Sequence, residues 1–296
     1  MLAHDIKSYQ DLVTSHEAVR DGFLEQALRK VAAAEPYIAQ AIHFQNRLQE
    51  IPDLTSLIDA TDIREELTAT AGFSDKSAHN FSASELEEAL FEVLSKIEAN
   101  SRKDWRSEIV FRFLLTRGDS LGGAMRNIIG AAAQEKFSGA LITALAQERT
   151  TPMITRASTG KIQRISWTHR VLMFDRTSRF VGNNIDVILT QQPSEDMSDR
   201  SLLSNQGYYL ACGELKGGID PAGADEHWKT ATRALDRIRE KFAPPLTPKL
   251  FFVGAAIEDS TAKEIFAQLE SGALTTAANL NIPEQIANLA DWLINL

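Results

Sequence analysis

Two carboxylates and a lysine in the second half of the chain have the types and spacing of a hydrolytic site. Asp186 lies in an apolar stretch at 184–189, and Glu214 and Lys216 end a second apolar stretch 28 residues further on. Alternate residues of a strand share a face, so Glu214 and Lys216 project together. Leu215 points to the opposite side, and its backbone carbonyl remains available. If the two strands are neighbours, Asp186 joins this cluster.

Such a cluster predicts a bound Mg²⁺ ion. Two carboxylates a few ångströms apart repel each other unless a cation lies between them, and Mg²⁺ prefers oxygen ligands and keeps water molecules for chemistry. The single cysteine, Cys212, cannot form an internal disulfide or a thiol cluster, so a metal must bind oxygen or histidine. We expect Asp186, Glu214 and the Leu215 carbonyl to hold the metal. The metal and Lys216 would orient a phosphate, activate water and neutralise transition-state charge.

The pattern alone has a second explanation, because an acidic residue and a lysine on one strand are often a surface ion pair. The context favours a site. Glu214 and Lys216 lead into Gly217-Gly218, where missing side chains permit a tight turn or close approach of a backbone such as that of DNA. Strand ends are also where α/β proteins place their sites. We therefore interpret the cluster as the site of a phosphodiesterase.

A histidine follows in the loop and helix start at 219–229. His227 could be the general base, since the unperturbed pKa of imidazole suits proton transfer near neutrality. A histidine that only hydrogen-bonds a neighbouring loop is an equally good explanation from the sequence alone. Asp225 is expected to cap the helix, and Trp228 is expected in the core.

The first hundred residues are predicted to be helical, because apolar residues recur at intervals of three and four. Ser84-Glu85-Leu86-Glu87 has the form of a capping box, and Pro52 and Gly72 mark breaks between helices. Two further helices are expected, at 104–116 and 124–147.

A glycine-rich turn at 118–123 is predicted between these two helices. The turn lacks the Gly-Lys-Ser/Thr ending of a Walker motif, which argues against nucleotide hydrolysis. A helix start at such a turn still presents free amides to an anion, and Arg126 could add a contact to DNA phosphate or guanine. A plain helix cap explains Asp119 equally well.

After residue 160 the β-favouring stretches 165–174, 185–189 and 208–212 predict strands. A helix from Asp225 to Phe242 and an apolar run at 250–255 complete a βαβ unit. The fold class is therefore α/β. We expect a mainly helical region for DNA recognition and dimerisation at 1–150 and an α/β catalytic core at 151–296, with 191–206 as the most flexible piece.

The net charge of −9 is unusual for a protein that binds nucleic acid. The charge is segregated, however: residues 101–182 hold 14 Lys and Arg against 6 Asp and Glu. This segment could line a surface for a polyanion, or its arginines could simply be solvated. No apolar run approaches a membrane span, and the first residues lack the pattern of a signal peptide, so a cytoplasmic location is expected.

The block GELKGGIDPAGADEHWKT at 213–230 closely resembles the AvaI/BsoBI family of type II restriction endonucleases. The resemblance extends to 118–123, 251–258 and 292–295, and is weaker at 150–165 and 191–206. That family belongs to the PD-(D/E)xK superfamily, in which a mixed sheet is flanked by helices. The proline that precedes the first aspartate in that superfamily is replaced here by Ile185.

The resemblance implies a homodimer around double-stranded DNA that cuts the palindrome CYCGRG with Mg²⁺ and leaves 5′ overhangs. A DNA methyltransferase would be its functional companion. By position, Asp186, Glu214 and Lys216 would be catalytic, and His227 would activate the water. Lys76 and Asp220 match residues that contact bases, a lysine donating to purines and an aspartate accepting from cytosine.

Two other functions fit the same residues. One is a structure-selective nuclease of DNA repair or recombination, which would cleave branched DNA without a site preference on linear duplex. The other is a catalytically inactive DNA-binding regulator. The complete set of Asp186, Glu214 and Lys216 argues against an inactive protein.

Overall fold

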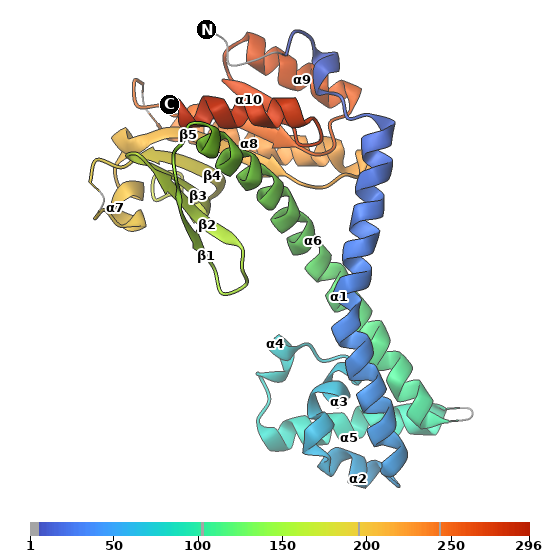
Figure 1. Ribbon diagram of the computed structural model, residues 1–296. Helices are drawn as coiled ribbons and strands as arrows, with labels where there is room; N and C mark the ends of the chain where they lie inside the picture. The colour runs from blue at the N-terminus through green and yellow to red at the C-terminus, as the bar shows by residue number, and fades with distance from the viewer. Residues whose placement is uncertain (1–5, 102–103, 195, 243) are drawn as a thin grey trace. The chain divides into compact units, whose positions relative to one another are not determined.

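The computed structural model describes residues 6–101, 104–194, 196–242 and 244–296, which form two compact units (Figure 1). The sheet unit combines the chain up to Glu25 with Ile128–Leu296, and the helical unit is Gln26–Asn127. The long helices α1 (His16–Glu50) and α6 (Trp105–Gln147) contribute residues to both units. None of the helices in the described ranges has the length and apolar character that crossing a bilayer requires.

The helical unit is built on the spacing of its apolar residues. Between α1 and α6 it contains α2 (Leu54–Asp59), η2 (Thr61–Ile63), α3 (Arg64–Thr70), α4 (Asp75–Ala78) and α5 (Ala83–Asn100). Residues from most of these helices meet in one core, where Phe44 packs edge-on against Phe113. The predicted breaks are confirmed: α1 ends two residues before Pro52, and Gly72 follows α3 with a φ of +84°.

The sheet unit contains seven strands whose order in space is their order in the chain. They are β1 (Met153–Arg156), β2 (Ile162–Trp167), β3 (Arg170–Thr177), β4 (Asn184–Gln191), β5 (Tyr209–Lys216), β6 (Lys249–Gly254) and β7 (Thr276–Asn279). Strands β1 to β5 pair antiparallel, whereas β5, β6 and β7 pair parallel. The sheet is therefore mixed, as the α/β prediction requires.

Helices connect the parallel strands. The predicted βαβ unit is confirmed, because β5 passes to β6 through α8 (Ala224–Lys241), and α9 (Asp259–Glu270) then leads to β7. The chain ends in α10 (Pro283–Ile294). The shorter elements of this unit are η1 (Tyr9–Leu12), α7 (Asp199–Leu203), η3 (Gln206–Tyr208) and η4 (Pro221–Gly223).

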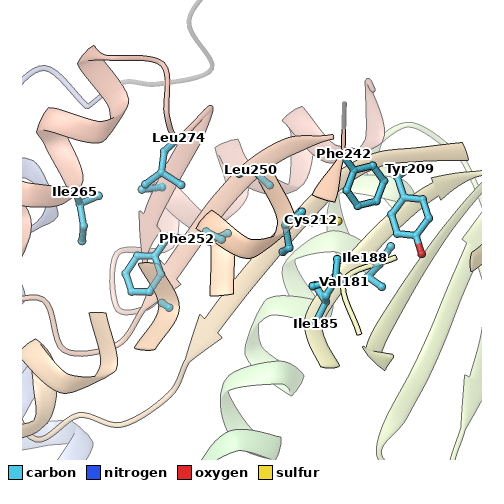
Figure 2. Packing of buried hydrophobic residues seen from close by; sticks show 14 of the residues in the cluster. Val181, Ile185, Ile188, Tyr209, Cys212, Phe242, Leu250, Phe252, Ile265 and Leu274 are labelled. Carbon is cyan, nitrogen blue, oxygen red and sulfur yellow. The ribbon is translucent and has the colours of Figure 1, made fainter. Parts of the chain in front are cut away.

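Both faces of the sheet are covered. On one face, α8 and α9 pack on alternate residues of the central strands, including Ile188, Cys212 and Phe252, and Figure 2 shows these side chains within one buried cluster. On the other face, α6 and α10 pack on Val187, Ala211 and other strand residues of the opposite parity. Burial on both faces explains why the central strands are rich in apolar residues.

The glycine-rich turn predicted at 118–123 is wrong, since these residues lie inside the continuous helix α6. Glycine disfavours a helix by only about 1 kcal/mol per residue, which the long flanking segments outweigh. Asp119 is therefore not a cap, and Arg126 is an exposed mid-helix residue rather than the neighbour of a helix start.

Two predicted caps also differ. Ser82, not Ser84, caps α5, because its hydroxyl accepts from the Glu85 amide while the Glu85 carboxylate accepts from the Ser82 amide. Helix α8 has Gly223 at its cap, and Asp225 instead bonds Lys229 one turn later. Trp228 is buried as predicted.

The units divide the chain differently from the boundary expected at residue 150. The second half of α6 places Ala133, Phe137 and Leu141 in the core beneath the sheet. The N-terminal segment joins the same unit, since Thr14 hydrogen-bonds both Ala255 and Ile257. Contacts distant in sequence thus set the division, and periodicity alone does not reveal them.

Gly213 provides a test of this packing. A Cβ there would lie 2.2 Å from the ring of Phe251, which is fully buried against Phe137 and Trp292. We expect Gly213→Ala to destabilise the sheet unit by about 1–3 kcal/mol, because the ring cannot move without disturbing its neighbours. Thermal unfolding followed by near-UV circular dichroism measures the effect.

Gly118→Ala is the matched control. Apart from the backbone of its own helix and its two chain neighbours, nothing lies within 4 Å of a Cβ at Gly118, so alanine should be neutral or slightly stabilising there. Equal melting temperatures for the two variants would contradict the packing described for Gly213.

Candidate active site

The three residues predicted to form the site lie together. Strands β4 and β5 are antiparallel neighbours in which Val187 pairs with Gly213 and Ile188 with Cys212. This register brings Asp186 beside the end of β5, where Glu214 and Lys216 project. All three side chains lie on the face of the sheet that carries α8. Asp186 is two residues from Ile188, and Glu214 and Lys216 are two and four residues from Cys212, and both Ile188 and Cys212 belong to the core on that face.

Lys216 joins the two carboxylates. Its Nζ donates to Asp186 Oδ2 at 2.8 Å and to Glu214 Oε2 at 2.7 Å. The Glu214 side chain is almost fully buried, with 4% exposure, whereas Asp186 and Lys216 remain 25% and 19% exposed. The site therefore opens to solvent on the side of Asp186 and Lys216. The ammonium offsets one of the two carboxylate charges.

The backbone of Leu215 completes the cluster. Its amide donates to Asp186 Oδ2 at 3.0 Å, and its side chain packs in the core of the opposite face, as predicted. In an extended strand the N–H and C=O of one residue point to the same side. The Leu215 carbonyl therefore points toward β4, whereas the Lys216 carbonyl points toward β6 and accepts from the Ala255 amide at 2.8 Å.

Burial shifts the proton affinity of the cluster. It raises the pKa of Glu214 to about 7, and the Asp186 charge adds to the rise while Lys216 opposes it. For Lys216, burial acts to lower the pKa, but the Glu214 and Asp186 carboxylates outweigh it and the pKa is raised. Protonation of Glu214 thus stabilises the folded state relative to the unfolded chain. This contribution is complete below pH about 4.5 and is lost as the pH rises to about 7.

His227 lies on the same side of the sheet, in the first turn of α8. Its Nε2 occupies the space beside Gly218, where a Cβ would be 2.6 Å away, and it also lies near Gly223, where a Cβ would be 3.5 Å away. The imidazole is half-buried, and Gly218, against which it packs, stands two residues beyond Lys216 along the chain.

The glycine pair makes room for neighbouring parts of the protein. Gly218 makes room for His227, and a Cβ at Gly217 would lie 2.5 Å from the side chain of Ala133 in α6. Both glycines thus permit close packing within the protein, and the approach of a DNA backbone to them stays a prediction. A Gly-Gly pair in a sequence predicts that another group lies close to the backbone, but it does not identify that group.

Asp220 is exposed and caps a turn. Its Oδ1 accepts from the Ala222 amide at 3.0 Å at the start of η4. One carboxylate oxygen therefore has a structural role in the loop between β5 and α8.

The remaining predicted DNA contacts, Lys76 and Arg126, belong to the helical unit and are exposed there, in α4 and α6 respectively. Several basic residues of the 101–182 segment have structural partners instead. Arg106 donates to three backbone carbonyls around the end of α1, and Arg170 donates to the carbonyl of Leu296.

One supporting pair escaped prediction. Thr14 hydrogen-bonds the carbonyl of Ala255, the residue whose amide holds the Lys216 carbonyl, and accepts a hydrogen bond from the buried Asn279. These contacts brace the end of β5. Thr14 and Asn279 are 265 residues apart, and neither has a local sequence signal that points to the other.

The donor set fits a hard cation. Asp186, Glu214 and the Leu215 carbonyl supply oxygen atoms only, and a Mg²⁺ ion commonly takes one or two carboxylates and retains water. Within the described ranges, no group of three or more His, Cys, Asp or Glu side chains could hold a metal. Burial raises the pKa of the Cys212 thiol, which lies beneath the site, so this cysteine is not a nucleophile there.

Comparisons with known proteins find relatives that match nearly the whole chain. The family described as "Restriction endonuclease BsobI" matches residues 2–296. The type II restriction enzyme AvaI of Nostoc sp. is 39% identical over 99% of both chains. The type II restriction enzyme BsoBI of Geobacillus stearothermophilus is 39% identical over 98% of this chain and 97% of its own.

A match of this extent assigns the class: the chain is a restriction endonuclease. It belongs to the BsoBI family, and the resemblance noted in the block 213–230 is thereby confirmed over nearly the whole chain.

The coupling within the cluster can be tested by its opposite effects on Glu214. Asp186→Asn should lower the pKa of Glu214, because a neighbouring negative charge is removed, whereas Lys216→Met should raise it, because a neighbouring positive charge is removed. Carboxyl ¹³C NMR of metal-free, glutamate-labelled protein measures both. Shifts in the same direction would contradict the arrangement.

Proposed function

We propose that the protein is a type II restriction endonuclease that hydrolyses double-stranded DNA at a short palindrome, using Mg²⁺. The observation that carries the proposal is the Lys216 ammonium hydrogen-bonded to both Asp186 and Glu214 at the meeting of two strand ends. The same set in a D…E-x-K order is the PD-(D/E)xK arrangement. Family membership along the whole chain supports this assignment.

The oxygen donors of Asp186, Glu214 and Leu215 would hold the metal. When bound, Mg²⁺ polarises the phosphate and makes a coordinated water more acidic. Because the pKa of Glu214 is about 7 in the metal-free protein, a divalent cation competes with a proton at this carboxyl group. Asp186, being the more exposed carboxylate, is the one that solvent and substrate reach first.

The residues of the chain divide the remaining tasks. The Lys216 ammonium is held by two acceptors and is partly exposed, so it can contact a non-bridging phosphate oxygen and offset the charge that develops there. His227, in its neutral form, accepts a proton from the water that attacks phosphorus. The bond from phosphorus to the leaving deoxyribose oxygen then breaks.

The recognition site, the assembly and the companion enzyme are inferred from the family. We expect CYCGRG as the site, with 5′ overhangs, a homodimer whose symmetry matches the palindrome, and a DNA methyltransferase as the functional companion. Lys76 and Asp220 would read base edges, and Arg126 would contact the backbone or a guanine. The second oxygen of Asp220 would accept from cytosine, since Oδ1 already caps the turn. A cytoplasmic location stays a prediction.

Digestion of phage DNA in Mg²⁺, followed by sequencing of the ends, tests the proposal directly. We expect discrete fragments whose ends all lie in one short palindrome. Cleavage confined to branched DNA would instead indicate a structure-selective nuclease, and the absence of any cleavage would indicate a DNA-binding regulator.

Two variants test the cluster. Asp186→Ala and Lys216→Ala should abolish cleavage, because the first removes a ligand of the metal and the second removes the cation that offsets charge on the reacting phosphate, but both should leave binding of cognate DNA in Ca²⁺ intact. Fluorescence anisotropy with a labelled duplex separates the two effects. Lys229→Ala, on the exposed face of α8, is the control and should cut like the wild type. Residual cutting in the cluster variants would contradict the assignment.

His227 is tested separately. If it is the base, His227→Ala should slow single-turnover cleavage by about 100-fold or more and flatten the pH dependence of the rate below neutrality. Rapid-quench kinetics between pH 6 and 9 measures both. A rate close to that of the wild type would reject the catalytic role and leave a histidine that only fills the space beside Gly218.

A further inference from the structure

One side of α1 in the helical unit is apolar and uncovered. Four large aliphatic side chains, Leu28, Val31, Ile38 and Ile42, are exposed to 62%, 62%, 46% and 56%. The same helix buries Phe44 and Leu48 in the core of the unit. Helix α1 therefore has apolar residues on two sides, and only one of these sides has a partner within the described residues.

The spacing of the exposed residues is that of a seam between helices. Leu28, Val31, Glu35, Ile38 and Ile42 follow at intervals of three or four. At 3.6 residues per turn, these five positions lie within roughly 80° of the helix circumference. A repeat of seven residues with two apolar positions is the pattern by which two helices pack along their length. We refer to these five residues as the α1 seam.

The residues beside the seam suit a close approach. Ala27, Ala32 and Ala39 flank it and are exposed. Small side chains at flanking positions allow two helices to pack near to each other. The seam itself contains one charged residue, Glu35, which lies at its centre.

The composition argues against DNA as the occupant. Binding to the phosphate backbone depends on Lys and Arg side chains, and the α1 seam has none. Its single charge is negative. The seam instead has the character of a protein interface.

We propose that the α1 seam packs against the α1 seam of a second copy of this chain. The inference rests on the proposed function, because a palindromic site is matched by a two-fold dimer, and it names the surface by which the copies meet. A two-fold interface uses the same patch on both subunits, and a seam symmetric about Glu35 is complementary to itself. Leu28 and Ile42 lie seven residues on either side of this centre.

The available area is sufficient for a dimer contact. Four large aliphatic side chains at about half exposure, together with the flanking alanines, present roughly 400–600 Å² in each copy. Two copies would bury roughly 800–1,200 Å² there, close to the lower limit of about 1,000 Å² for specific interfaces. The seam can thus account for a weak dimer by itself or for part of a larger one.

Sedimentation velocity over a dilution series, with and without cognate duplex in Ca²⁺, tests the proposal. In Leu28→Glu/Ile38→Glu, charge is placed in the seam, and the dimer should dissociate at least 100-fold more readily. Glu35→Leu removes the like charges at the centre and should tighten the dimer. Both substitutions are at exposed positions and use residues that favour helices, so helix content should be unchanged.

Phe91→Glu on α5 is the matched control, since Phe91 is 48% exposed in the same unit but lies outside the seam. We expect its dimer to dissociate like that of the wild type. A dimer that survives Leu28→Glu/Ile38→Glu, or one that Phe91→Glu disrupts instead, would overturn the seam but leave the proposed function standing. A wild-type chain that stays monomeric even on cognate DNA would overturn the seam and the homodimer together.

Discussion

The closeness of two carboxylates across adjacent strands is the constraint on which the site depends. Asp186 and the buried Glu214 would repel each other in a low-dielectric setting, and the Lys216 ammonium between them offsets part of that repulsion. Burial and the Asp186 charge still hold the pKa of Glu214 near 7. The cluster is therefore short of positive charge, which is the electrostatic condition that favours a divalent cation and a phosphodiester substrate.

The rest of the sheet unit supports this arrangement from two directions. The antiparallel pairing of β4 with β5 sets the distance from Asp186 to the Leu215 backbone, and the parallel pairing of β5 with β6 holds the Lys216 carbonyl. Thr14 braces the same point from a segment at the other end of the chain. Glycines at 213, 217 and 218 allow Phe251, α6 and His227 to approach closely, so the site is positioned by packing as much as by hydrogen bonds.

The two units use their exposed residues differently. In the sheet unit, the exposed edge of the site is charged and suited to a phosphate. In the helical unit, the exposed side of α1 is apolar, with Glu35 as its one charge, and is suited to a protein surface. A nuclease that cuts both strands of a palindrome needs two active sites in a fixed relation, so the proposed dimer surface and the proposed catalytic cluster would serve the same function.

The sequence by itself determined the candidate cluster and the local elements. Alternation placed Glu214 and Lys216 on one face with Leu215 on the other, and the apolar stretches marked the central strands and the βαβ unit, because these patterns depend only on near neighbours. Tertiary structure decided the rest. It joined residues 118–123 into α6, assigned the two glycines to packing inside the protein, moved the boundary from residue 150, and brought Thr14 to Asn279. Each of these outcomes depends on contacts between distant segments, which compete with local preferences of about 1 kcal/mol and have no trace in local sequence.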